Sequence, residues 1–171
     1  MSIVIRSEIP ADAPEISRLI TQAFLGNPHS EGTEAAIVDA LRSAGALVLP
    51  LVALRDGEIV GYSTFSPVRL STGESGWFGL GPVAVAPDAQ RQGIGTRLIE
   101  DDLLQLIAAD AAGCVVVGEP NFYRRFGFAP VAHLRVNGIP PEYILARAFA
   151  GPEPDAVLIY HPAFGLPDPN A

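Results

Sequence analysis

Residues 80–98 have the sequence LGPVAVAPDAQRQGIGTRL, and this stretch decides the fold. The apolar segment Leu80–Ala86 predicts a strand, and a loop rich in polar residues follows it. From Arg91 to about Ala109, apolar residues recur at helical spacing and predict a long helix. The apolar run Cys114–Gly118 then predicts a buried strand. A strand, a helix and a strand in this order predict a parallel, right-handed unit.

The first part of the chain predicts a strand and two helices. Ile3–Arg6 is a short apolar run typical of a strand. Asp12 is a candidate N-cap, and Glu15 stands three residues later, the spacing of a capping box. A second helix is expected to begin near Thr33 and to end at Gly45.

A hairpin comes next. Two apolar stretches, Leu47–Leu54 and Ile59–Phe65, flank the turn signal Asp56-Gly57. Later in the chain we expect strands at Val131–Val136 and Ala156–Tyr160, a short helix or turn at Phe122–Phe126 closed by Gly127, and a short helix within Pro140–Ala150. The fold class is therefore α/β, an α+β mixed sheet flanked by helices.

Composition and charge narrow the class of protein. The 171 residues are 49% hydrophobic and 18% charged, which predicts one globular domain over residues 1–171 with a proline-rich tail at 162–171. The net charge of −8 disfavours nucleic acid as a partner. No run of 18 apolar residues predicts a membrane span, and no secretory signal is visible. The single cysteine, Cys114, excludes an intrachain disulfide, so we expect a cytoplasmic protein.

The loop before the long helix has the chemistry of a phosphate site. The first turn of a helix has unpaired backbone amides and the positive end of the helix dipole. Gly93 and Gly95 leave the backbone accessible, so consecutive amides could surround a diphosphate. Arg91, and also Arg97, could add positive charge. The alternative is that the glycines only form a helix entry turn.

Pro82 suggests a second binding feature in the preceding strand. Proline cannot donate to a sheet ladder and marks an edge or a bulge. A bulge would separate the strand from its neighbour and release main-chain groups of Val83 and Val85 for an extended ligand. The alternative is a proline at the start of an ordinary strand.

Two segments resemble a known family. Gln90-x-x-Gly93-x-Gly95 resembles the acetyl-CoA loop of GNAT N-acetyltransferases, and Tyr123-x-x-x-Gly127-Phe128 resembles a second element of that family. The longer segment Gly118–Phe128 is similar to that of a bacterial subgroup of predicted N-acetyltransferases. The resemblance implies a GNAT fold, acetyl-CoA as co-substrate, and cofactor contacts from Val83, Ala84, Val85, Gln90, Arg91, Gln92, Gly93, Ile94, Gly95, Thr96, Asn121 and Tyr123.

The resemblance also implies an acetyl transfer to a primary amine by direct attack in a ternary complex. Tyr123 is the candidate general acid for the departing thiolate, and a packed aromatic is its alternative. Glu34 and Glu119 are candidate general bases, although Glu34 could simply complement a helix N-terminus. Cys114 has apolar neighbours that favour an inert core thiol over a nucleophile. The histidines lack ligand spacing, so we expect no metal.

Other functions stay open at this point. Gly93-x-Gly95 could belong to a dinucleotide-binding fold with Glu119 on the ribose, but Leu98 stands where the third glycine is required. A non-catalytic acyl-CoA-binding domain is a further alternative. The acidic charge favours a cationic amine, either a small molecule or a peptide, as the acceptor. The late strands could pair between two chains in a homodimer.

Overall fold

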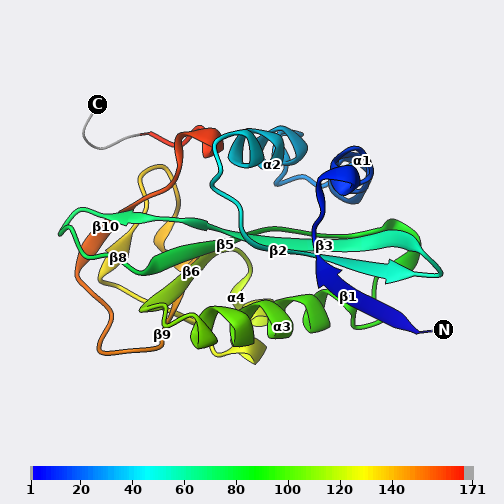
Figure 1. Cartoon of the computed structure of the whole chain (residues 1–171). Helices are drawn as coiled ribbons and strands as arrows, with labels where there is room; N and C mark the ends of the chain where they lie inside the picture. The colour runs from blue at the N-terminus through cyan, green and yellow to red at the C-terminus, as the bar shows by residue number, and fades with distance from the viewer. Residues whose placement is uncertain (1, 168–171) are drawn as a thin grey trace. The chain divides into compact units, whose positions relative to one another are not determined.

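The structure, a computed structural model, describes residues 2–167 (Figure 1). The chain forms two compact units, each assembled from separated stretches. Unit 1 contains Met1–Phe65 and Gly81–Gln105, and unit 2 contains Ser66–Leu80 and Leu106–Ala171. The central strand β5 (Trp77–Val85) contributes its first half to unit 2 and its second half to unit 1.

An antiparallel arrangement of three strands is the framework of unit 1. The strand β2 (Val48–Arg55) pairs with β1 (Ile3–Ser7) on one side and with β3 (Glu58–Pro67) on the other. The hairpin between β2 and β3 turns at Asp56 and Gly57, whose φ angles are 53° and 82°. Two consecutive residues with positive φ are typical of a type I′ turn, so the hairpin prediction is confirmed.

Helices cover both faces of these strands (Figure 1). The helices α1 (Ala13–Phe24) and α2 (Glu34–Ser43) lie on one face, and the part of α3 (Ile94–Ala108) within unit 1 lies on the other. Side chains alternate between the two faces along β2: Val52 packs with the cluster of α1 and α2, whereas Leu51 and Ala53 pack with that of α3. Burial of these two apolar clusters supplies most of the driving force for folding unit 1.

The start of α1 differs from the expected capping box. Asp12 occupies the N-cap position but makes no capping hydrogen bond. Its carboxylate instead accepts hydrogen bonds from the Ile9 amide (2.9 Å) and from the Arg6 guanidinium (2.8 and 3.1 Å). Glu15 accepts from the Ile59 amide (3.3 Å). A nearby arginine and a strand edge therefore compete successfully for both carboxylates.

Unit 2 contains the parallel pair that the sequence predicts. The first half of β5 pairs with β6 (Gly113–Val117) in parallel, from Trp77↔Gly113 to Gly79↔Val115. The strand β5 begins at Trp77, earlier than the predicted Leu80. On its other side β6 pairs antiparallel with β9 (Ile144–Ala148), which also pairs with β7 (Ala129–Pro130). The mixed parallel and antiparallel sheet with helices is thus confirmed.

Two sequence predictions fail in unit 2. The stretch Pro140–Ala150 is not a short helix: after the 3-10 turn η4 (Pro141–Tyr143) it forms β9. Ile144, Leu145 and Ala146 are all buried there, because β9 completes the sheet beside β6. The predicted strand Val131–Val136 shrinks to β8 (Leu134–Arg135).

Short elements complete both units. A second small sheet joins β4 (Arg69–Leu70), β10 (Ala156–Ile159) and β8. The helix α4 (Pro120–Tyr123) continues into the 3-10 turn η3 (Arg124–Phe126), which ends at Gly127 with a φ of 86°, as predicted. The remaining 3-10 turns are η1 (Pro10–Asp12), η2 (Pro87–Ala89) and η5 (Pro162–Phe164).

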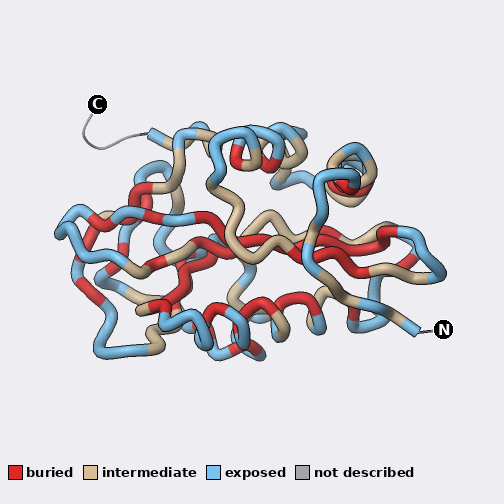
Figure 2. The backbone as a smooth tube through the Cα atoms, viewed as in Figure 1, coloured by how far each residue is buried: buried red, intermediate tan, exposed pale blue. Residues whose placement is uncertain are grey.

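Burial follows the strands most closely. Figure 2 shows the long strand β3 as buried over most of its length, with exposed residues at its ends. Tyr62 in this strand is fully buried and donates a hydrogen bond to Glu8 (3.2 Å), which also pairs with Arg42 (2.6 Å). Across the described range 2–167, no helix has both the length and the apolar character needed to cross a membrane. Part of the predicted tail, residues 168–171, lies outside this range.

Candidate active site

The loop between β5 and α3 exposes backbone at the start of the helix. The helix begins at Ile94, later than the predicted Arg91, because Arg91 and Gly93 both take left-handed conformations with φ of 64° and 80°. A Cβ atom added to Gly93 would meet no atom within 4 Å. The space beside this glycine is therefore open to an external group.

The backbone amides at this helix start have no partner. The Arg97 amide donates to the Gly93 carbonyl (3.1 Å) and closes the first turn. The amides of residues 93–96 donate to no acceptor within the described part of the chain. Unpaired amides at the positive end of a helix dipole form a ready anion site. This geometry matches the expectation drawn from Gly93 and Gly95.

Two glutamine side chains fix the conformation of the loop, one by a bond to β5 and one by a bond within the loop. The side-chain amide of Gln90 donates to the Val85 carbonyl (3.1 Å), and that of Gln92 donates to the Asp88 carbonyl (3.4 Å). Gln90 is therefore a loop-positioning residue, and the Val85 carbonyl is already bonded. This corrects the expectation that both main-chain groups of Val85 are available to a ligand.

The two arginines of the loop region differ in their freedom. Arg91 is exposed, and its guanidinium makes no hydrogen bond or ion pair within residues 2–167. Arg97 instead donates to the Ile3 carbonyl (3.3 Å). Arg91 is consequently the better-placed source of positive charge beside the unpaired amides.

The second half of β5 carries the other predicted contacts. A cis peptide bond joins Gly81 to Pro82, and Val83 and Val85 are half-buried while Ala84 is buried. Ala84 packs with the apolar cluster of α1 and α2. The side chain of Ala84 therefore belongs to the core, and any ligand contact from this residue would use its backbone.

In unit 2, Tyr123 is seated on a glycine at the end of β6. A Cβ atom on Gly118 would lie only 2.5 Å from Cε2 of Tyr123, closer than any side chain tolerates. The ring also makes edge-to-face contacts with Phe122 and Phe128, with centroid separations of 4.9 and 6.1 Å. Tyr123 is thus both packed and half-buried, with its position set by Gly118.

The environment keeps the Tyr123 phenol protonated. Burial, together with a smaller electrostatic effect of the nearby Cys114, raises the pKa of Tyr123 to about 12. A phenol that retains its proton at neutral pH can act as a general acid. Cys114 itself is fully buried, and its sulfur lies 3.6 Å from the Val115 carbonyl oxygen. This setting agrees with a core thiol and not with an exposed nucleophile.

The remaining acidic candidates lie in different units. Glu119 is the exposed N-cap residue of α4, and its neighbour Asn121 is also exposed. Glu34 is the first residue of α2 in unit 1 and accepts a hydrogen bond from the Ser30 hydroxyl. It lines a hollow of about 170 Å³ together with Ile20 and Phe24. Glu34 therefore has a fixed hydrogen-bond partner and lines a hollow with both apolar and polar residues, beyond a simple role at a helix end.

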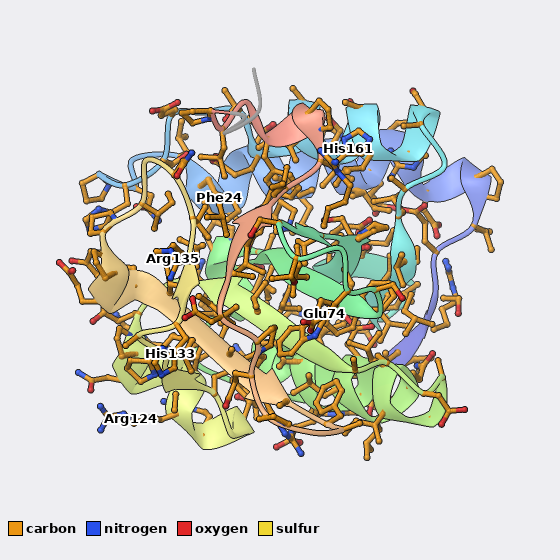
Figure 3. All side chains as sticks on the ribbon, turned by 90° about the vertical axis from the view of Figure 1, so that its left-hand side faces the viewer. Phe24, Glu74, Arg124, His133, Arg135 and His161 are labelled. Carbon is orange, nitrogen blue, oxygen red and sulfur yellow. The ribbon has the colours of Figure 1, made fainter. Side chains whose placement is uncertain are left out.

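In the range that the structure covers, no cluster of three histidine, cysteine, aspartate or glutamate side chains could hold a metal ion. His133 and His161 lie far apart in unit 2 (Figure 3). The His161 Nδ1 atom accepts a hydrogen bond from the Ala163 amide (3.0 Å) at the start of η5.

Two features of the site region were not predicted. The first is the contact of Gly118 with Tyr123. Both residues lie within one short motif, which is the only feature of the sequence that could have indicated this contact. Asp102, on the buried side of α3, accepts a hydrogen bond from the Ser63 hydroxyl (2.5 Å), while its other oxygen has no partner among the described residues. Burial raises the pKa of Asp102 to about 8. Asp102 follows Glu100 and Asp101, and nothing in this acidic run indicated that one of its side chains is buried.

Comparison with known proteins identifies the family. Residues 48–130 match the acetyltransferase (GNAT) domain. The chain is 39% identical over 132 residues to the uncharacterized N-acetyltransferase YhbS of Escherichia coli K12, covering 77% of this chain and 76% of that protein. The chain therefore belongs to the GNAT family of N-acetyltransferases.

Solved structures of the family agree with the fold. A GNAT family acetyltransferase of Brucella melitensis, crystallised with acetyl-CoA, is 44% identical with a TM-score of 0.86, covering 95% of this chain and 98% of that one. Escherichia coli YhbS, crystallised with CoA, is 34% identical with a TM-score of 0.85, covering 95% of this chain and 92% of that one. The resemblance noted in the sequence is confirmed, and the dinucleotide-binding alternative is set aside.

Proposed function

We propose that this chain binds acetyl-CoA and transfers its acetyl group to a primary amine by direct attack in a ternary complex. The observation that carries the proposal is the row of unpaired amides at residues 93–96 beside the open space at Gly93. These amides, with Arg91, would hold the diphosphate. The relatives crystallised with acetyl-CoA and CoA support the same ligand.

The second half of β5 would hold the pantetheine arm of the co-substrate. The backbone of Val83, Ala84 and Val85 offers groups for an extended ligand, although the Val85 carbonyl is occupied by Gln90. An amide of this strand could also polarise the thioester carbonyl, and one such donor lowers a barrier by about 3 kcal/mol in well-studied enzymes. The family motif extends the set of proposed cofactor contacts to Gln92, Ile94, Thr96, Asn121 and Tyr123.

The transfer step needs one proton donor and one proton acceptor. The amine nitrogen attacks the thioester carbonyl carbon, the carbon–sulfur bond breaks, and the sulfur takes a proton from Tyr123. The amine must lose its own protons to a base or to water, because amines are mostly protonated at neutral pH. Glu34 and Glu119 are the proposed candidates for that base. The motif and the protonated state of the phenol support the role of Tyr123.

A direct assay tests the proposal. Purified protein is incubated with acetyl-CoA and a panel of amines, covering polyamines, amino acids, aminoglycosides and peptides, and the released thiol is measured. The chain contains no lysine, so acetylation of its own side-chain amines cannot contribute to the signal. Amine-dependent thiol release is the expected result.

A binding experiment separates this function from its alternatives. Acetyl-CoA should raise the melting temperature, and NAD should have no effect, because a ligand that binds only the folded state stabilises it. Stabilisation by acetyl-CoA without thiol release for any amine would indicate a non-catalytic acyl-CoA-binding domain. Absence of any stabilisation by acetyl-CoA or CoA would refute the proposed diphosphate site.

A further inference from the structure

A pocket in unit 2 lies outside every segment assigned above. It has a volume of about 230 Å³ and is lined by residues of β4 and β10, by Val136 and Asn137 just after β8, and by η5 and the residues that follow it. Its floor is apolar: Val136, Leu158 and Ile159 are 5%, 2% and 7% exposed. His161, labelled in Figure 3, marks the start of η5 at its border.

An aromatic side chain forms a rigid wall of this pocket. Tyr160 lies against Gly79, where an added Cβ atom would come within 3.3 Å of Cε1 of the ring. The same ring packs against Phe164 in a tilted arrangement with a centroid separation of 5.1 Å. Because the ring is in contact with two other residues, the wall would change little when a ligand enters.

One cation at the rim of the pocket has no partner. Arg69 pairs through its backbone with Ile159, but its guanidinium makes no hydrogen bond or ion pair within the described chain. By contrast, Arg6, Arg42, Arg55 and Arg135 each pair with a carboxylate. The Arg69 guanidinium therefore stays unneutralised beside an apolar pocket, although the net charge of the chain is −8.

The nearest acidic side chain in the sequence does not neutralise this arginine. Glu74 shares with Arg69 the lining of a separate hollow beside Trp77. Its carboxylate accepts a hydrogen bond from the Thr72 hydroxyl (3.3 Å) and forms no ion pair with Arg69. The guanidinium therefore retains its donors for an external acceptor.

The geometry points to a binding site for a small organic carboxylate with an apolar or aromatic body. Arg69 would grip the carboxylate with two parallel hydrogen bonds, which suits a planar guanidinium. Asn137 also lines the pocket, and its side-chain amide has no partner among residues 2–167, so it would add a donor. The body of the ligand would cover the apolar floor and lie against Tyr160.

The pocket also has a relation to the proposed reaction. Tyr160 lies against Gly79, which pairs with Val115 of β6, and Tyr123 lies against Gly118 just after β6, so the pocket wall and the proposed general acid both adjoin this strand. The carboxylate could thus belong to the acceptor amine itself or to a separate acid that modulates the enzyme. Only the first source rests on the proposed function.

Binding is tested without any turnover. Isothermal titration calorimetry compares phenylacetate with its neutral isostere phenylacetamide, using the full chain. We expect phenylacetate to bind about tenfold more tightly, the effect of one charge-assisted hydrogen bond. Arg69→Met should remove this preference, and Arg69→Lys should retain part of it. Equal binding of the two compounds, or no saturable binding of phenylacetate, would overturn the proposal.

A matched variant controls for loss of charge alone. Arg18 is exposed on α1 in unit 1 and also lacks a partner within the described residues, so Arg18→Met removes the same charge elsewhere. It should keep the full preference for phenylacetate. If Arg18→Met lowers the preference as much as Arg69→Met does, the effect is general electrostatics and the pocket assignment is wrong.

Kinetics then distinguish the two sources of the carboxylate. Phenylalanine and phenylalaninamide are compared as acceptors of the acetyl group. One outcome is a KM about tenfold lower for phenylalanine than for phenylalaninamide. If Arg69→Met removes this difference and leaves kcat for phenylalaninamide unchanged, the carboxylate belongs to the acceptor. Equal KM values, with a rate for phenylalaninamide that changes when phenylacetate is added, assign it to a separate acid. Calorimetry decides the binding site even if neither amine is acetylated.

Discussion

Two glycines of this protein have opposite surroundings, although each belongs to a motif of the family. Gly93 faces open space, and a Cβ atom added there would touch nothing. Gly118 is covered by the ring of Tyr123, and an added Cβ atom would lie 2.5 Å from it. The first glycine leaves room for a ligand and the second leaves room for a side chain of the same chain. A motif glycine is therefore not by itself a sign of ligand contact.

The largest effect on activity is expected when Tyr123 loses its hydroxyl. Tyr123→Phe should lower kcat by about 100-fold or more, the usual contribution of a general acid, with little change in the KM for acetyl-CoA. Steady-state kinetics measure both. Tyr143→Phe, which removes the hydroxyl of an exposed tyrosine, is the control and should leave kcat unchanged. Normal turnover of Tyr123→Phe would remove the acid role.

The pH profile sharpens the same prediction. Since burial raises the pKa of Tyr123 to about 12, the phenol should remain protonated throughout the range in which the protein is folded. If kcat falls between pH 7 and about 10, the fall should therefore be the same in the parent and in Tyr123→Phe. An alkaline limb below pH 10 that disappears in Tyr123→Phe would contradict this assignment of the pKa.

The covered glycine can be tested by filling its space. Gly118→Ala should displace the Tyr123 ring and lower kcat on the order of 100-fold, because a shift near 1 Å at a catalytic group has such a cost. In a Tyr123→Phe background the same substitution should have a much smaller effect on kcat. Additive effects of the two substitutions would show that Gly118 does not act through the tyrosine.

Substitution of Gly93 should weaken CoA binding and leave the rate of acetyl transfer nearly unchanged. Gly93→Ala places a side chain at a φ of 80° and should weaken CoA binding about tenfold, with kcat at saturation nearly unchanged. Gly73→Ala is the matched control, since Gly73 has a φ of 86° and equally open surroundings. Both variants should lose similar stability, but calorimetry should find weaker CoA binding only for Gly93→Ala.

The smallest effect on activity is expected for Asp102, a buried residue in the middle of the same helix. The pKa of Asp102 is raised to about 8 from 3.8. Between these two pH values the folded state therefore keeps a proton that the unfolded state has released. The free energy of unfolding should fall as pH rises from about 4 to 8, by up to about 1.4 kcal/mol per pH unit, and change no further above that.

Asp102→Asn should remove this slope. The variant should match the parent near pH 4 and be more stable near pH 8, as measured by urea unfolding across that range. Leu104→Asn, on an exposed residue of the same helix, serves as the comparison and should leave the slope intact. An unchanged slope in Asp102→Asn would mean that another group holds the proton.

Local sequence signals determined much of the fold and the ligand loop. The turn at Asp56-Gly57, the parallel order of β5, α3 and β6, and the short turn closed by Gly127 were all predicted. Each depends on interactions between residues close in sequence, such as helical spacing or the positive φ that glycine adopts easily. For the same reason residues 90–95 and Tyr123-x-x-x-Gly127-Phe128 could be recognised from their spacing alone.

Contacts between distant segments decided the rest. Ile144–Ala148 is a strand because β6 and β7 provide its partners, and no local pattern shows that. The same is true of Asp102 against Ser63, of Tyr160 against Gly79, and of the carboxylates of Asp12 and Glu15. Burial and hydrogen bonding depend on which segments contact one another in the folded protein. The local sequence around a residue does not show those contacts. The sequence thus predicted where a diphosphate could bind, whereas the tertiary structure decided which glycine is open and which arginines lack a partner.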